Sequence, residues 1–135
     1  MAGRDAVAEL FAAYAAANDL RDAGLIGECF TPEGAFTLHI AGADTIGPLQ
    51  PRDAFLEFFG QAFAAQSDQR RHVVTNLRLL DDGETSARAE AYLTLIVTDG
   101  GHTALKSAGR YDAEVVREAE GWRFRALTLY LDSPF

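Results

Sequence analysis

The sequence contains few cysteines and few basic residues. Its 135 residues include one cysteine, Cys29, and 12 lysines and arginines against 20 aspartates and glutamates. A single cysteine excludes an internal disulfide and fits a reducing cytoplasm. The formal net charge of −8 argues against a nucleic-acid partner, because phosphate groups would be repelled. No stretch approaches membrane-spanning length, and the N-terminal MAGRDAVAEL lacks the apolar run of a signal peptide, so we expect a cytoplasmic protein without a membrane partner.

Motifs that bind metals or phosphates are also missing. The three histidines, His39, His72 and His102, lie far apart, and no HxxxH, HxH or CxxC spacing occurs. The sequence contains no GxGxxG, GxxxxGK[ST] or GxSxG, which argues against a phosphate cradle and a serine-hydrolase elbow. We therefore expect no metal and no cofactor. Cys29, within a short apolar segment, is expected to be a small core residue.

The hydrophobic pattern predicts helices in the first half of a single domain that spans residues 1–135. Hydrophobic residues make up 48% of the chain, which is enough for a buried core. Residues 5–18 show the spacing of one helical stripe, with Asp5 as a candidate N-cap. Asp22 is a candidate N-cap for a short second helix that ends before Thr31-Pro32. A third helix is expected from about residue 52 to residue 66, with phenylalanines along its apolar face.

The second half of the sequence predicts strands joined by short turns. Residues 35–40 alternate in polarity, with Phe36 and Leu38 on one face and His39 on the other. From residue 71 onward, consecutive strands separated by turns such as DDGE predict an antiparallel meander. Helices followed by strands give an α+β fold with the helices on one face of the sheet.

The last predicted strand, at residues 121–131, suggests a partner subunit. Regular alternation places Trp122, Phe124 and Tyr130 on one face and Leu127 and Leu129 on the other. A strand that is apolar on both faces needs cover on both faces. Three helices cover one side, so we expect a homodimer formed through the outer sheet face.

Four stretches carry a family resemblance that runs nearly the length of the chain. They are YAAANDLRD, CFTPEGAF, RRHVVTNLRLLDDGETSARAEAYL and GRYDAEVVREAEGWRF. With them the sequence resembles the SnoaL-like branch of the fold shared by nuclear transport factor 2, ketosteroid isomerase and scytalone dehydratase. The resemblance implies a cone-shaped α+β barrel, in which three N-terminal helices cover a curved, mixed or antiparallel sheet and enclose a pocket. Isomerases, dehydratases, cyclases, epoxide hydrolases and non-catalytic binders share this fold, so the site must decide the function.

The resemblance places Tyr14, Asp19 and His72 at positions that contribute acid–base groups in dehydratase-like members. A histidine exchanges protons near neutral pH, a carboxylate orients its ring, and a tyrosine hydroxyl polarises a substrate oxygen. His72 and Asn76 differ by an even number, so on a regular strand they share a face and Asn76 is expected to bind substrate. Each residue also has a structural explanation: a buried histidine, a capping aspartate at Asp19 or Asp22, and a core tyrosine.

Aromatic residues supply the expected substrate-binding surface, although the same residues would serve as ordinary core. The positions expected to line the pocket are Phe30, Phe36, Leu38, Phe55, Phe59, Phe63, Tyr92, Tyr111 and Trp122. The second histidine of the dehydratase site is not reproduced, because the matching strand offers Glu90, Tyr92, Thr94 or Ile96. Nor is the Asp-Arg-Asp set of the epoxide hydrolases evident, although Arg88 or Arg110 could orient a carboxylate.

Two functional classes follow from this resemblance. The first is a cofactor-independent enzyme that moves protons on a hydrophobic, oxygenated small molecule of polyketide, terpenoid or steroid type. Dehydration, cyclisation and isomerisation are the reactions considered. The second is a non-catalytic binding protein or accessory subunit of the same fold. The small subunit of a ring-hydroxylating oxygenase ranks below both, because the chain is short and shows no extra docking segment.

Overall fold

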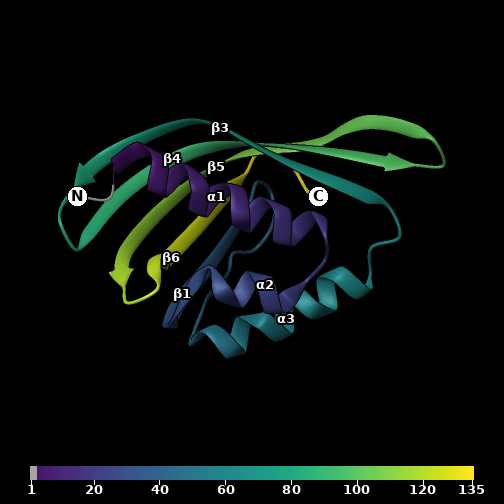
Figure 1. The fold of residues 1–135 in the computed structure, drawn as a ribbon. Helices are drawn as coiled ribbons and strands as arrows, with labels where there is room; N and C mark the ends of the chain where they lie inside the picture. The colour runs from purple at the N-terminus through teal and green to yellow at the C-terminus, as the bar shows by residue number, and fades with distance from the viewer. Residues whose placement is uncertain (1–2) are drawn as a thin grey trace.

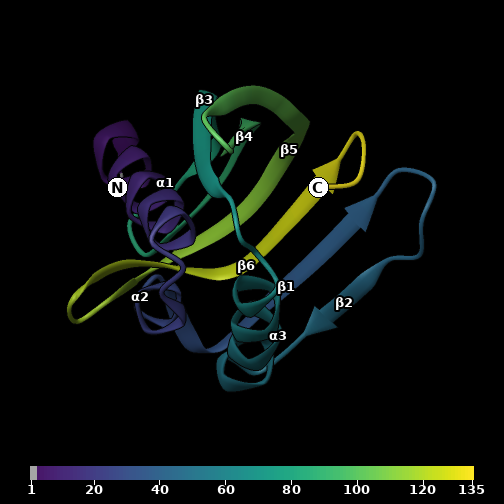
Figure 2. The same cartoon turned by 90° about the vertical axis from the view of Figure 1, so that its right-hand side faces the viewer.

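The computed structural model describes residues 3–135 and contains three helices packed on one side of a six-stranded sheet (Figure 1). The strands lie in the order β2-β1-β6-β5-β4-β3, and β1 runs parallel to β6 while every other neighbouring pair is antiparallel. The sheet bends around the helices into a cone (Figure 2). The elements are α1 (Gly3–Asp19), α2 (Ala23–Glu28), β1 (Phe30–Ile40), β2 (Ile46–Leu49), α3 (Arg52–Ala64), β3 (Gln69–Asp82), β4 (Ser86–Asp99), β5 (His102–Glu118) and β6 (Gly121–Leu131).

The three expected helices are confirmed, with corrections at their ends. Helix α1 begins at Gly3, so Asp5 lies in its first turn, whereas the sequence predicted Asp5 as the N-cap. A carboxylate in the first turn still interacts favourably with the helix dipole. Asp22 is the N-cap of α2, and its Oδ1 accepts a hydrogen bond from the backbone N–H of Leu25 at 3.1 Å. The helix predicted to end before Thr31-Pro32 ends earlier than expected, and Thr31-Pro32 lies within strand β1. Helix α2 ends at Glu28, and proline holds the preceding residue extended, which suits strand β1.

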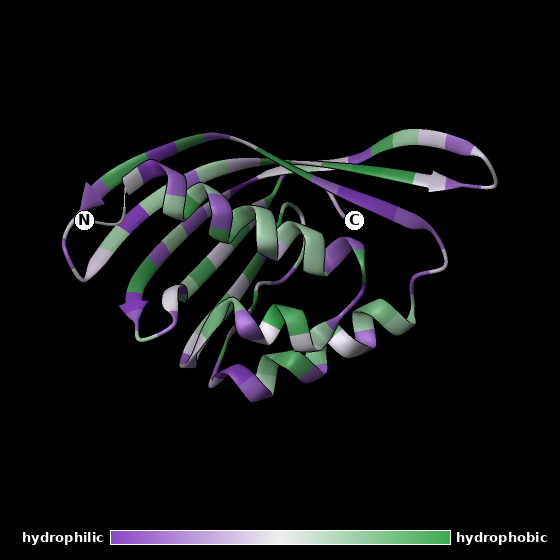
Figure 3. Ribbon diagram, viewed as in Figure 1, coloured by the Kyte–Doolittle hydropathy of each residue, from purple (hydrophilic) through white to green (hydrophobic). Residues whose placement is uncertain are grey.

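The predicted antiparallel meander is confirmed in strands β3 to β6. Hydrophobic and hydrophilic residues alternate along these strands, as expected for a sheet with one buried face (Figure 3). Phe36 and Leu38 are buried on the inner face of β1, whereas the ring of His39 lies on the outer face and stacks on Tyr130 with 4.7 Å between ring centroids. Among residues 3–135, no helix is long and apolar enough to cross a membrane.

A bulge in β6 overturns the expected division of its two faces. Glu114 pairs with Ala126 and Val115 pairs with Phe124, so Arg125 is the extra residue between the two pairs. The bulge reverses the alternation, and Phe124 is therefore fully buried on the same side as Leu127 instead of facing outward. The outer face of β6 keeps only half-buried residues, which are Ala126, Thr128 and Tyr130.

Candidate active site

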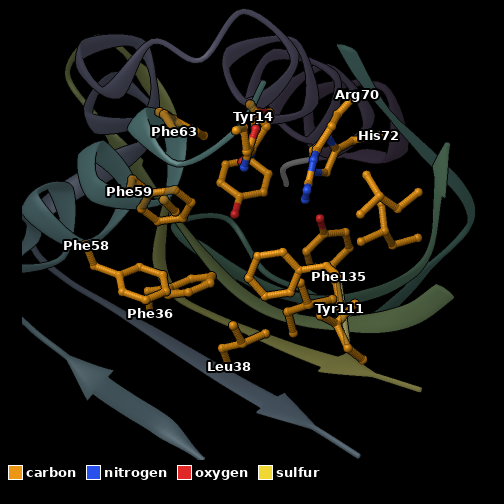
Figure 4. A pocket seen from close by; sticks show the side chains of 17 residues that line it. Tyr14, Phe36, Leu38, Phe58, Phe59, Phe63, Arg70, His72, Tyr111 and Phe135 are labelled. Carbon is orange, nitrogen blue, oxygen red and sulfur yellow. The ribbon is translucent and has the colours of Figure 1, made fainter. Parts of the chain in front are cut away.

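A cavity of about 60 Å³ lies between the concave face of the sheet and helices α1 and α3 (Figure 4). Seven of the residues predicted to form the site line this cavity. They are Tyr14, Phe36, Leu38, Phe59, Phe63, His72 and Tyr111. Because most of these side chains are apolar, the few polar groups among them decide what chemistry the cavity supports.

His72 and Asp19 form the shortest polar contact of the residues at the cavity wall. The ring Nδ1 of His72 lies 2.7 Å from Oδ1 of Asp19, and the backbone N–H of His72 donates to the same oxygen at 2.9 Å. Both side chains are mostly buried, with 14% and 15% of their surfaces exposed. The carboxylate therefore fixes both the backbone and the ring of His72.

The fold explains why Asp19 meets His72. Strand β3 is at the edge of the sheet, so N–H groups that point away from β4 have no partner within the ladder. Asp19 is the last residue of α1 and satisfies one of these groups, while Nε2 of Gln69 donates to the Asp19 carbonyl oxygen at 3.2 Å. A carboxylate at the C-terminus of a helix is unfavourable for the helix dipole. Its position is better explained by the contact with His72 than by helix capping.

The contact also determines which ring nitrogen of His72 faces the cavity. A carboxylate only accepts hydrogen bonds, so the neutral imidazole carries its proton on Nδ1 and leaves Nε2 as an acceptor. His72 lines the cavity and Asp19 does not, which places Nε2 on the cavity side of the ring. No residue within 3–135 forms a hydrogen bond with Nε2. In this arrangement Nε2 is able to accept a proton or a hydrogen bond from a group in the cavity.

Two tyrosine hydroxyl groups face the same space. In Figure 4 the hydroxyl groups of Tyr14 and Tyr111 both lie in the middle of the view, below the labelled side chains of Arg70 and His72. Both side chains are almost completely buried, at 2% and 1% exposure. Burial raises the pKa of Tyr14 and of Tyr111 well above the usual value, and for Tyr111 the nearby Tyr14 and Asp19 raise the pKa further. Both groups are therefore phenols at neutral pH and are available as hydrogen-bond donors.

Asn76, predicted to bind substrate beside His72, is not part of the cavity. The pairing of β3 with β4 shifts between Thr75 and Arg78, and Asn76 has a left-handed backbone with φ of 56°. Asparagine tolerates this conformation better than most residues. The bulge interrupts the alternation that the prediction relied on, and the Asn76 side chain is exposed.

Four predicted aromatic contacts also lie outside the cavity. Phe30 and Phe55 are core residues, whose rings pack edge to face with centroids 4.7 Å apart. Tyr92 is 51% exposed because it lies on the outer face of β4. Trp122 is half-buried and lines a separate hollow with residues of α1 and α2. The structure places these four residues outside the cavity, and aromatic composition alone does not distinguish core from cavity wall.

Several lining residues were not predicted. Asn18 donates through Nδ2 to the Tyr14 carbonyl at 3.0 Å and was assigned only to the helix stripe. Arg70 lies two residues before His72, so alternation along the strand would have placed it on the same face. Phe135 gives no such signal, because it follows the last strand. The other unpredicted lining residues are Phe58, Ala62, Gln66, Leu93, Leu95, Leu129 and Leu131.

A comparison with known protein families matches residues 1–128 to the SnoaL-like domain. The chain belongs to the SnoaL-like family. No protein of curated function matches this SnoaL-like chain. Among the residues that the structure describes, no three His, Cys, Asp or Glu side chains lie close enough together to hold a metal ion.

Solved structures with the same fold support this assignment. One, from Novosphingobium aromaticivorans and provisionally described as an aromatic ring hydroxylase, is 26% identical with a TM-score of 0.76, covering 98% of this SnoaL-like chain and 89% of its own. A protein from Catenulispora acidiphila, solved in complex with S-DNPA, is 22% identical with a TM-score of 0.79. The match covers 94% of this SnoaL-like chain and 91% of the C. acidiphila chain. A third structure, also from N. aromaticivorans, is provisionally described as the beta subunit of an aromatic-ring-hydroxylating dioxygenase. It is 15% identical with a TM-score of 0.80, and the match covers 98% of this SnoaL-like chain and 90% of the subunit. At these identities the last two show the fold alone.

Proposed function

We propose that this SnoaL-like protein is an acid–base enzyme that needs no cofactor and acts on a hydrophobic, oxygenated small molecule. The observation that carries the proposal is the 2.7 Å contact between Asp19 and His72 at the wall of an apolar cavity. Polyketide-, terpenoid- and steroid-like compounds have the required combination of apolar rings and oxygens. The related fold from C. acidiphila, solved in complex with S-DNPA, supports a small-molecule ligand.

The proposed chemistry begins with proton transfer to His72. The lone pair of Nε2 takes a proton from a carbon next to a substrate carbonyl, and the C–H electrons form the C=C bond of an enolate. The phenols of Tyr14 and Tyr111 donate hydrogen bonds to the carbonyl oxygen as its negative charge grows. Asp19 stabilises the imidazolium and is a positioning residue, because it acts through His72.

The fate of the imidazolium proton distinguishes the possible reactions. In a dehydration, the enolate electrons expel a hydroxyl group from the next carbon, and the imidazolium protonates it to release water. In an isomerisation, the proton returns to a different carbon. In a cyclisation, the enolate carbon attacks a second carbonyl, and the proton goes to the new alkoxide. Each route regenerates neutral His72, so one oriented base serves all three.

The test is turnover by the His72→Ala variant on a panel of aromatic β-hydroxy ketones and diketones, followed by mass and absorbance. We expect turnover to fall about 10²- to 10⁴-fold, which is the usual contribution of a general base. His102→Ala is the matched control, since His102 is exposed at the start of β5 and does not line the cavity. Equal rates in the two variants would contradict a catalytic role for His72.

A second candidate is a binding protein without catalysis. Strand β4 contributes only Leu93 and Leu95 to the cavity, so no second titratable group faces His72 from that strand. A binder would show ligand affinity that changes with pH but no conversion of any compound in the panel. Ligand binding that persists in His72→Ala, with no product from the wild type, would favour this candidate.

We also propose that a second copy of the chain covers the outer face of the sheet. Tyr130 lies between His39 and Arg110 on this face, with the Arg110 guanidinium 4.3 Å from the ring centroid. Tyr92 pairs with Arg110 on the next strand and is half exposed. This row of flat side chains is suited to packing against its own copy. The face also carries ion pairs such as Arg88–Asp112, so it is less apolar than the sequence predicted.

A further inference from the structure

The cavity is too small for the ligands proposed above. At about 60 Å³ it has room for a few water molecules, whereas pockets for drug-sized ligands measure about 300 Å³ or more. A groove of about 490 Å³ lies next to it on the outside. The two hollows share five lining residues, which are Phe58, Ala62, Gln66, Arg70 and Phe135. The side chains of these residues separate the cavity from the groove.

Phe135 is the exposed member of these five boundary residues, whereas the other four are half-buried. It follows strand β6, outside any helix or strand, and the residue is 39% exposed while its ring lines the cavity (Figure 4). Its described ring contact is with Arg70, whose Cζ lies 5.7 Å from the ring centroid. A ligand ring that stacks on Arg70 in the place of Phe135 restores this contact, so the exchange of one ring for the other loses little.

Arg70 has unused hydrogen-bonding capacity at the same place. Its Nε donates to Oδ1 of Asp68 at 3.0 Å, and the arginine side chain is only 11% exposed. Neither Nη atom forms a hydrogen bond with a residue in the range 3–135. A guanidinium with two free nitrogens at the wall of an apolar cavity is suited to bind a carboxylate.

We infer that the site accepts a flat hydrophobic carboxylic acid, with its carboxylate on Arg70 and its ring in the place of Phe135. This inference rests on the proposed function, since it names the substrate class for the same site. Arg70 and His72 point to the same side of β3 and are about 7 Å apart along the strand. The acid group therefore binds roughly one ring's width from the carbon that His72 deprotonates. Arg70 sets specificity in this arrangement and takes no part in proton transfer.

The inference is tested by binding, which needs no turnover. The probes are 2-naphthaleneacetic acid and its neutral amide, measured by titration calorimetry at neutral pH. We expect the wild type to bind the acid about tenfold more tightly than the amide, the size of one charge-assisted hydrogen bond. Arg70→Gln should abolish this preference and Arg70→Lys should keep part of it. The control Arg71→Gln should leave it unchanged, because Arg71 is exposed on the opposite face of β3.

Phe135→Ala tests the second half of the inference. The variant should bind both probes several-fold more tightly and keep the preference for the acid, because the competing ring is gone. Four results would each overturn the inference. They are equal binding of acid and amide by the wild type, an unchanged preference for the acid in Arg70→Gln, no gain in affinity in Phe135→Ala, and no binding of either probe. None of these results depends on His72, so a failed binding test together with His72-dependent turnover would reject the inference and leave the proposed function in place.

Discussion

Replacing Asp19 tests whether the carboxylate holds His72 as the structure describes. One oxygen of Asp19 accepts two hydrogen bonds, from the backbone and from the ring of His72, at 2.9 and 2.7 Å. A hydrogen bond to a charged group contributes about 1.5 to 3 kcal/mol, and Asp19→Ala leaves both donors without a partner in a mostly buried position. We expect the free energy of unfolding to fall by about 3 kcal/mol. For a domain of this size, that loss lowers the melting temperature by about 10 °C.

Two further variants separate the contact with His72 from a general effect of removing an aspartate. Asp19→Asn keeps an oxygen acceptor but loses the charge, so a loss of about 1 kcal/mol is expected. Asp22→Ala removes an N-cap, with its single bond to the Leu25 N–H, and should also cost about 1 kcal/mol. Urea unfolding followed by circular dichroism measures all three variants. If Asp19→Ala proved no more destabilising than Asp22→Ala, the two-bond description would be refuted.

The nitrogen resonances of His72 provide an independent assay of the same contact. In the wild type, the neutral ring should carry its proton on Nδ1, and in Asp19→Ala this preference should disappear. Two-dimensional NMR that correlates ring protons with ring nitrogens distinguishes the two tautomers. A wild-type ring protonated on Nε2 would refute the reasoning even if the stability data agreed, because Nε2 could then not act as the base.

Three other measurements test separate parts of the structure. Burial raises the pKa of the Cys29 thiol from 9.0 to about 11, so iodoacetamide should label it slowly in the native state and rapidly in urea. The unfolded thiol ionises at a lower pH than the folded thiol. The stability that the buried thiol contributes is therefore lost as the pH rises from 9.0 toward about 11 and is unaffected below that range. Asn76→Val should cost about 1 to 2 kcal/mol in urea unfolding, and Asn76→Gly should be close to neutral, since a φ of 56° excludes β-branched residues; equal losses would argue against strain at the bulge. Tyr92→Glu should convert a dimer to a monomer in light-scattering measurements if the outer sheet face pairs with a second copy, whereas Glu9→Gln on exposed α1 should not.

The fold could be predicted from the sequence because its signals are local and repeated. The helical stripe from Val7 to Tyr14 and the run of alternating strands from β3 onward each extend over many residues, so single exceptions do not change the assignment. The ends of elements depend on fewer residues. Thr31-Pro32 gave a misleading stop signal, because the same restriction of the backbone that ends a helix also favours the start of a strand.

The site was only partly predictable, and two bulges account for part of the difference. Alternation along a strand assigns a side chain to the inner or outer face, and it correctly joins Phe36 with Leu38. One extra residue reverses the assignment for everything beyond it, as happens near Asn76 in β3 and at Arg125 in β6. Neither bulge contains a glycine, so the sequence gives no sign of it.

His72 and Arg70 precede the β3 bulge, whereas Asn76 lies at the bulge. This difference explains why the first two line the cavity and Asn76 is exposed. The regular part of β3 directs His72 and Arg70 toward the cavity, and α1 delivers Asp19 to the unpaired edge of that same segment. A bulge placed a few residues earlier would turn His72 outward and leave Asp19 without a partner. The position of the β3 bulge therefore decides which polar groups meet inside the cone. The pairing of β3 with β4 sets this position, and a single sequence does not reveal such a long-range pairing.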